Sequence, residues 1–121
     1  MALSGLAIEG DTGLNTVNNF GTVTGNVILG SNSNAFNNMA GAVFNAGPIV
    51  NLGPGNTLTN SGTLSLLGGA WAVQTTTLTG NLVQTATGRL LTDVNLADAT
   101  SDRINVSGTT SLAGAVQVQV V

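Results

Sequence analysis

Asn18-Asn19-Phe20-Gly21-Thr22-Val23 is the first of three similar segments that decide the fold; the others are Asn37-Asn38-Met39-Ala40-Gly41-Ala42-Val43 and Thr59-Asn60-Ser61-Gly62-Thr63-Leu64. In each segment an Asn precedes a small turn with Gly, and apolar or β-branched residues follow. Asn19, Asn38 and Asn60 thus recur at a step of about 20 residues, which is typical of a solenoid in which each repeat forms one coil of short strands. We therefore predict an all-β parallel β-helix with about 20 residues per coil.

The stacking of coils predicts which side chains meet. Strands of neighbouring coils lie about 4.8 Å apart, so residues one repeat apart sit above one another. We expect Asn19, Asn38 and Asn60 to form a column in which the side-chain amides hydrogen-bond from coil to coil, which also helps to fix the register. Glycines recur at a similar step, so we expect these to occupy one turn position of the coil: Gly21, Gly41 and Gly62.

Short runs rich in β-branched and apolar residues predict the strands. Each run is too short for a helix and is bounded by residues that favour turns. Alternate residues, such as Leu64 and Leu66, are expected to point into the core. The predicted strands are 22–24, 26–29, 42–45, 49–52, 57–59, 63–67, 75–79, 80–85, 90–95, 103–106 and 115–120.

The regularity of the repeat divides the chain into three parts. Residues 1–14 are an N-terminal strand and turn segment, residues 15–80 form the β-helix coils, and residues 81–121 form the C-terminal coils with a cap-like end. Gly68-Gly69-Ala70-Trp71 interrupts the repeat between the regular coils and this end. We expect Trp71 to fill a gap in the core or to cover its rim.

The composition excludes several functions. Only 6% of the residues are charged, with two arginines and a net charge of −3, which cannot neutralise a nucleic-acid backbone. No cysteine is present for disulfides or thiolate metal sites. No apolar run approaches the roughly 20 residues of a membrane-spanning helix. Met1 to Leu6 lacks the basic and long apolar regions of a signal peptide, so we expect the sequence to be a piece of a longer protein.

The acidic residues are the candidates for chemistry: Glu9, Asp11, Asp93, Asp98 and Asp102. A pair of carboxylates can hydrolyse a glycosidic bond, and the loop from Asp98 to Asp102 offers the oxygen ligands that calcium prefers. Turn capping and a surface ion pair with Arg103 account for these acids more simply. The calcium-binding nonapeptide of β-solenoids is absent, and so are His and Lys as bases for a nucleophile. We therefore predict no catalytic residue, no metal ligand and no cofactor-binding residue.

A closing segment, Asp102-Arg103-Ile104-Asn105-Val106-Ser107-Gly108 followed by Leu112-Ala113-Gly114, resembles the C-terminal part of an autotransporter passenger, as do the runs 36–45 and 56–64. The resemblance implies a right-handed parallel β-helix, carried to the cell surface of a Gram-negative bacterium by a downstream outer-membrane barrel (type V secretion). It also implies an autochaperone-like role for residues 81–121. We therefore expect a non-catalytic, surface-exposed stalk segment that supports folding and display of the passenger.

Two other functions stay open on the sequence. Val116 to Val121 is a flat, uncharged strand of the kind that pairs with neighbours, so the chain is also a candidate for an adhesin-like module that self-associates through exposed coil edges. A carbohydrate-binding or carbohydrate-degrading β-helix is the third alternative, and a cluster of acids facing one groove would favour it. No small-molecule cofactor and no nucleic acid is expected as a partner.

Overall fold

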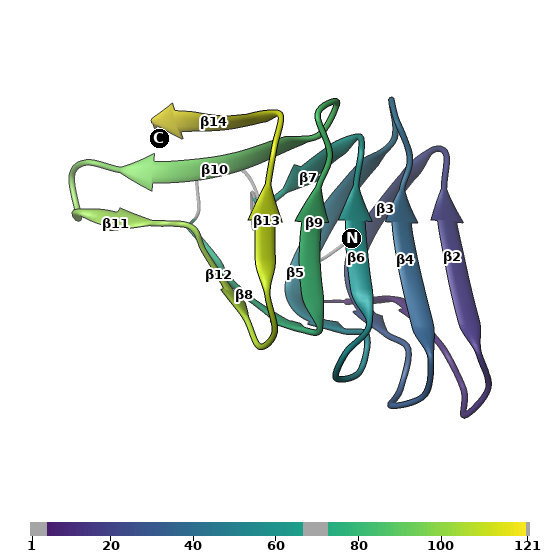
Figure 1. Cartoon of the computed structure of the whole chain (residues 1–121). Helices are drawn as coiled ribbons and strands as arrows, with labels where there is room; N and C mark the ends of the chain where they lie inside the picture. The colour runs from purple at the N-terminus through teal and green to yellow at the C-terminus, as the bar shows by residue number, and fades with distance from the viewer. Residues whose placement is uncertain (1–4, 67–72, 121) are drawn as a thin grey trace.

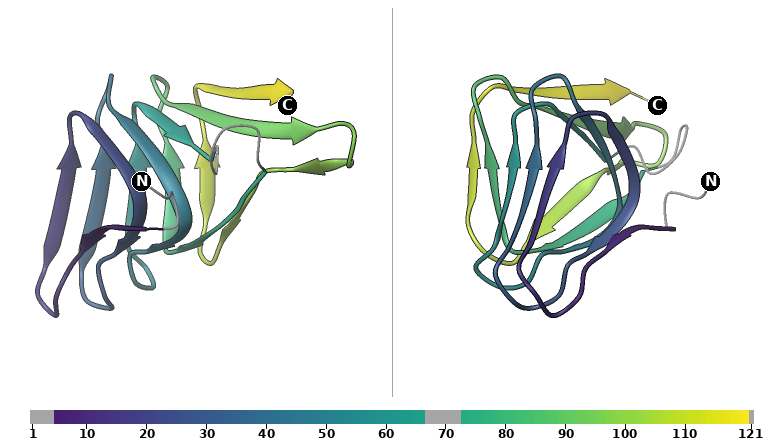
Figure 2. Two further views of the ribbon diagram at one scale, coloured as in Figure 1. Left: turned by 180° about the vertical axis from the view of Figure 1, so that it is seen from behind. Right: turned by 90° about the vertical axis from the view of Figure 1, so that its right-hand side faces the viewer.

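The computed structural model describes residues 5–66 and 73–120, and all regular elements in these ranges are strands. The strands stack in parallel into a β-solenoid of about five turns, with equivalent positions about 24 residues apart. Seen along the stack, the coils superpose as a rounded triangle (Figure 2). This confirms the predicted all-β parallel β-helix. Within the described ranges, no helix has the length and apolarity to cross a membrane.

Each coil has three sides, and one side forms a sheet of its own. This five-stranded parallel sheet faces the viewer in Figure 1. Its strands, in spatial order, are β2 (Asn15–Asn19), β4 (Asn34–Asn38), β6 (Thr57–Asn60), β9 (Asn81–Gln84) and β13 (Thr110–Leu112).

The other two sides belong to one bent sheet, because two long strands run round the corner between them. The strands that follow the first sheet along the chain are β3 (Thr22–Ile28), β5 (Val43–Asn51), β7 (Thr63–Ser65), β10 (Arg89–Asn95) and β14 (Ala115–Val120). The third side adds β1 (Leu6–Glu9), β8 (Thr75–Thr79) and β12 (Arg103–Val106), paired with the second halves of β3 and β5 or with each other. The short β11 (Thr100–Ser101) is antiparallel to the end of β10.

The corner between these two sides corrects one prediction. The sequence predicts separate strands on either side of Gly25, and again on either side of Gly47-Pro48, but β3 and β5 are continuous through both corners. Their pairing shifts register between Gly25 and Val27, so the corner is a β-bulge. Gly25 has a φ of +126°, and a Cβ there would collide with the carbonyl oxygen of Gly5. Glycine is therefore required at this bend, but it bends the strand and does not end it.

The core is a single column of apolar side chains inside the triangle. On the first sheet, Val17, Phe36, Leu58 and Leu82 lie in register from coil to coil. Phe36 is fully buried and stacks on Phe44, with ring centroids 4.6 Å apart. Because each coil contributes to the same column, no coil buries its apolar side chains alone.

The turn that follows the first sheet corrects the glycine alignment. Thr22, Val43 and Thr63 are paired in register, so the preceding residues Gly21, Ala42 and Gly62 are equivalent. The prediction for Gly41 is therefore wrong by one position. The cause is the length of the turn, since the segment 39–42 between Asn38 and Val43 is longer than the segment 20–21 between Asn19 and Thr22.

Coil length changes along the chain. Hydrogen-bonded side chains at the end of the first sheet are separated by 19, 22 and 24 residues in successive coils. In the last coil, Asn81 and its partner Thr109 are separated by 28 residues. The predicted spacing of about 20 thus fits the first coils, and the later coils are longer.

The sequence also predicts a division of the chain into three parts. The divisions at 1–14, 15–80 and 81–121 stay predictions, although β1 already pairs with β3 as part of the first coil. Trp71 and its predicted role lie outside the described residues.

Candidate functional site

The predicted asparagine column exists and is longer than predicted. The Nδ2 of Asn19 donates to the Oδ1 of Asn38 at 2.9 Å, and Asn38 donates in the same way to Asn60 at 2.9 Å. Asn60 then donates to the Oε1 of Gln84 at 3.0 Å. We call these four residues the amide ladder. Gln84 was not predicted because it follows Asn60 at a longer step than the earlier ones and differs from it in type.

Every amide of the ladder makes at least one further hydrogen bond, to a main-chain group of this chain. Asn19, Asn38 and Asn60 each donate to a main-chain carbonyl of the following coil as well. At one end the Oδ1 of Asn19 accepts the N–H of Gly21, and at the other end Gln84 donates to two carbonyls of the last turn. Buried amides without partners would be costly. These amides are satisfied, so they have a structural role and offer no free group to a ligand.

A second asparagine column lies at the N-terminal ends of the strands of the same sheet, whereas the amide ladder lies at their C-terminal ends. Asn15 donates to the Oδ1 of Asn34 at 2.9 Å, and Asn34 and Asn56 both donate to the carbonyl of Leu52. Asn15, Asn34 and Asn56 follow one another at the same steps as Asn19, Asn38 and Asn60. The sequence therefore contained this signal, which the prediction missed.

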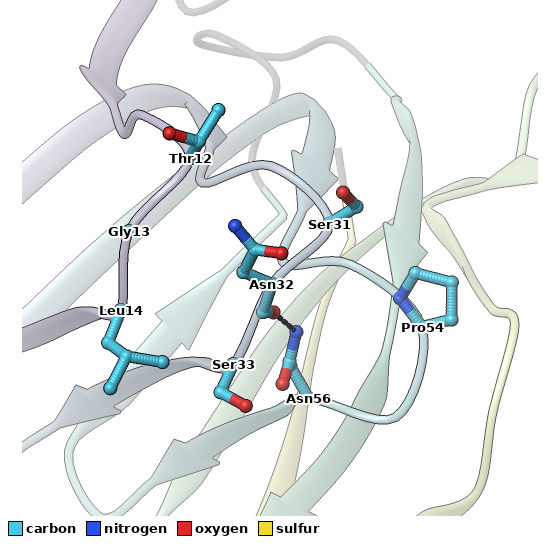
Figure 3. Close-up of a pocket in the computed structure, with 8 residues that line it drawn as sticks. All are labelled: Thr12, Gly13, Leu14, Ser31, Asn32, Ser33, Pro54 and Asn56. Carbon is cyan, nitrogen blue, oxygen red and sulfur yellow. Dashed lines mark hydrogen bonds between the residues drawn. The ribbon is translucent and has the colours of Figure 1, made fainter.

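A shallow groove of about 430 Å³ lies near this second column (Figure 3). It is formed between three turns that precede β2, β4 and β6, where Asn56 donates to the carbonyl of Asn32 at 2.6 Å. None of its side chains is ionisable, so the groove has no acid, base or charged metal ligand. It is lined by Thr12, Gly13, Leu14, Ser31, Asn32, Ser33, Pro54 and Asn56.

Two of the five acids come together, away from that groove. Asp93 in β10 and Asp102 between β11 and β12 are both buried. The Asp102 carboxylate accepts the N–H of Gln74 at 2.6 Å and the N–H of Asp93 at 2.7 Å. Burial raises the pKa of Asp102 and that of Asp93, and the neighbouring Asp93 charge raises the pKa of Asp102 further. The prediction that these acids serve surface turns and an ion pair is wrong for this pair, because Arg103 is exposed and bonds neither carboxylate.

The remaining acids are spread over the surface. Glu9 lies in β1, Asp11 lies in the next turn, and Asp98 lies in the loop between β10 and β11. The Oδ2 of Asp98 accepts a bond from Asn95, whereas the oxygens of Asp102 accept main-chain N–H groups, so the two carboxylates of the loop from Asp98 to Asp102 have different partners. In residues 5–66 and 73–120 no three His, Cys, Asp or Glu side chains are grouped as metal ligands.

Comparisons of this chain with protein-family models, with curated proteins and with solved structures give no match.

Proposed function

We propose that this chain is a structural, non-catalytic stalk segment of an autotransporter passenger, displayed on the outer surface of a Gram-negative bacterium. The observation that carries the proposal is the amide ladder, because it joins successive coils and is closed at both ends within the chain. Such a stack extends in one direction and needs no ligand to fold. The closing segment that resembles autotransporter passengers forms β12 and the turn into β14 on the last coil.

The C-terminal coils are proposed to fold first and to template the others, with the downstream barrel as their partner in the parent protein. The antiparallel β10–β11 hairpin supports this, because only residues 96–99 separate its strands. The parallel pairs of the coils join residues that are far more distant along the chain, such as Asn15 with Asn34. Contacts that close a short loop cost less entropy and form faster than distant ones.

The test is surface display with two matched variants. The chain is placed upstream of an autotransporter outer-membrane barrel, and intact cells are treated with proteinase K. Val17 in the first coil and Val106 in the last coil both pack against the core while half-buried. We expect Val106→Asp to abolish the protease-resistant surface product, and Val17→Asp to leave a resistant C-terminal fragment. Equal loss from both variants would contradict the templating role, and failure of the parent chain to reach the surface would contradict the stalk.

Self-association is the second candidate, and the last strand favours it. Val116, Val118 and Val120 are 52%, 57% and 60% exposed, although they are in register with Leu90, Thr92 and Val94 on β10. Among the described strands β14 pairs only with β10, so its other edge is free to pair with a second copy. Light scattering over a range of concentrations tests this candidate. Association that Val118→Lys abolishes would support it, and a monomer at all concentrations would reject it.

A carbohydrate-binding or carbohydrate-degrading β-helix has less support. Asp93 and Asp102 are both buried, and the Asp102 carboxylate accepts two main-chain N–H groups. The groove in Figure 3 is lined by neutral residues. Glycoside hydrolysis requires two carboxyl groups that flank the bond. A glycan array combined with a reducing-sugar assay tests this alternative, and binding or turnover in either assay would revive it.

A further inference from the structure

The carboxylate of Asp102 joins its own β10–β11 hairpin to a segment that lies 28 residues earlier in the sequence. Its Oδ1 accepts the N–H of Gln74, just before β8, and its Oδ2 accepts the N–H of Asp93 in β10. The main chain repeats both connections: the N–H of Asp102 donates to the carbonyl of Asp93 at 2.8 Å, and the N–H of Arg103 donates to the carbonyl of Gln74 at 2.9 Å. Asp102 therefore holds the β10–β11 hairpin, which extends beyond the stack in Figure 1, against the last coil.

Asp93 is the unusual member of this pair. It is only 2% exposed, and its Oδ1 is buried without a hydrogen-bond partner. Its neighbour in register on β14 is the neutral Gln119, and the segment before β8 contributes the neutral Gln74. From β11 and β12 the facing charge is the like-charged Asp102.

The other charged side chains of this region do not compensate for the two carboxylates. Arg89 on β10 and Arg103 on β12 are exposed, and neither makes an ion pair with Asp93 or Asp102. Asp98 is exposed in the hairpin loop and accepts a bond from Asn95. No cation in the described part of the chain therefore faces the pair.

These contacts give the two acids different preferred charge states. Asp102 accepts two N–H bonds, which favour its anion, although burial and the Asp93 charge oppose it and raise its pKa. The buried Oδ1 of Asp93 has no hydrogen-bond partner, and burial raises the pKa of Asp93. Two buried carboxylates close together share a site most easily when one of them holds a proton. The two N–H donors on Asp102 and the unpartnered Oδ1 of Asp93 therefore favour a proton on Asp93 and the anion on Asp102.

We propose that Asp93 and Asp102 form a pH-dependent latch, closed when Asp93 holds a proton and weakened when Asp93 becomes an anion. The latch fixes the β10–β11 hairpin to the segment before β8. It goes beyond the stalk function, because it makes the C-terminal coils more stable when Asp93 holds a proton than when Asp93 is an anion.

The pH dependence of stability follows from the difference in proton binding between the folded and the unfolded state. The folded state raises the pKa of Asp93 above its ordinary value of 3.8, so the folded state holds this proton more firmly than the unfolded chain does. The corresponding stability is fully present below the ordinary pKa and is lost as the pH rises through the raised pKa. Wild-type protein should therefore lose stability as the pH rises from 3.8 through the raised pKa of Asp93.

Urea unfolding of the full chain, followed by circular dichroism from pH 4 to pH 8, tests the latch. We expect the wild-type midpoint to fall as the pH rises. Asp93→Asn keeps a neutral side chain at every pH, so its midpoint should be higher than that of wild type at pH 8 and should fall less steeply as the pH rises, since only Asp102 then contributes to the fall. Asp98→Asn is the matched control, because Asp98 is an exposed acid near the same hairpin, and it should keep the wild-type profile.

A measurement on wild type alone covers the case in which Asp93→Asn does not fold. Hydrogen exchange, corrected for the intrinsic effect of pH, should show weaker protection of residues 89–106 at pH 8 than at pH 4, with residues 34–60 unchanged. An Asp93→Asn midpoint at or below that of wild type at pH 8 would overturn the latch. So would equal protection of residues 89–106 at the two pH values.

Discussion

The first coils and the last coils of this solenoid reach the same fold by different chemistry. Up to Asn60 the coils repeat at 19 and 22 residues, and neutral amides bond to their own kind across them. Beyond it the steps grow to 24 and 28 residues. There, Gln84 ends the ladder and a pair of buried carboxylates holds a hairpin to the coil.

This difference shows what a repeated column requires. A ladder forms only where equivalent residues of successive coils stay in register. The register is kept only if the extra residues of a longer coil lie in a turn. The second coil does so, since the longer turn after Asn38 leaves the amide bonds on both sides intact. The last coils instead insert a hairpin. Side-chain contacts such as those of Asp102 must then position the hairpin. In this arrangement the Oδ1 of Asp93 has no hydrogen-bond partner.

The largest effect should come from the core of the first coils. Phe36 is fully buried and stacks on Phe44, so Phe36→Ala should lower the free energy of unfolding by about 3–5 kcal/mol. The matched change in the last coil is Val118→Ala, where the side chain is exposed and the cost should stay within roughly 0.5 kcal/mol. Urea denaturation measures both. Similar losses from the two variants would mean that the two ends do not differ in burial.

A charge in the last coil should have the next largest effect. Val106 is half-buried and packs against the core, so Val106→Asp places a charge without a partner there and should cost about 2–3 kcal/mol. Thermal melting followed by circular dichroism measures the loss. An unchanged, cooperative melt would show that Val106 faces water in solution and that the core ends before the last coil.

The ladder itself is tested by Asn38→Ala. The change removes the donor to Asn60 and to the carbonyl of Thr63, and a buried acceptor left without its donor costs about 1–3 kcal/mol. Asn37→Ala is the control, because Asn37 bonds to Asn18 on the outer, solvent-facing side of the same strand and should change stability by less than about 0.5 kcal/mol. Equal effects in chemical denaturation would remove the ladder as a source of stability.

The smallest effect compares one turn position in two coils. A Cβ on Gly62 would collide with the carbonyl oxygens of Met39 and Ala42 in the coil before it, whereas a Cβ on Gly21 would meet nothing within 4 Å. Gly62→Ala should therefore lower the free energy of unfolding by about 1 kcal/mol. Gly21→Ala should be neutral or slightly stabilising, since Ala restricts the unfolded chain. A cost for Gly21→Ala as large as that for Gly62→Ala would contradict the stacking order of the coils.

The sequence predicted the stacking but not every residue of it. The nearly even steps between asparagines were sufficient to pair Asn19, Asn38 and Asn60. Strands β2 and β4 were absent from the predicted strands because Asn is disfavoured in strands by propensity. Here the amides of Asn15 and Asn34 instead bond from one strand to the next. Gly41 was misaligned because spacing along the chain does not show which turn is longer.

The carboxylate pair could not be predicted from the chain alone. Gln74, Asp93 and Asp102 are brought together by a long coil and a hairpin, and no periodic signal marks either. Asp102 in a polar run also has the usual appearance of a turn residue. Its burial follows from where the hairpin folds, which is tertiary information. The same reason leaves the function a proposal, because neutral stacked residues describe how a solenoid is held together and not what it contacts.

The most direct test of the stacked amides is hydrogen exchange of the side-chain NH₂ groups, measured by NMR on wild-type protein. The ladder predicts that the NH₂ groups of Asn19, Asn38, Asn60 and Gln84 exchange far more slowly than those of the outward-facing Asn18 and Asn37, because each ladder amide is held by two acceptors in a buried column. Exchange of the four ladder amides at the rate of the two outward-facing ones would contradict the account.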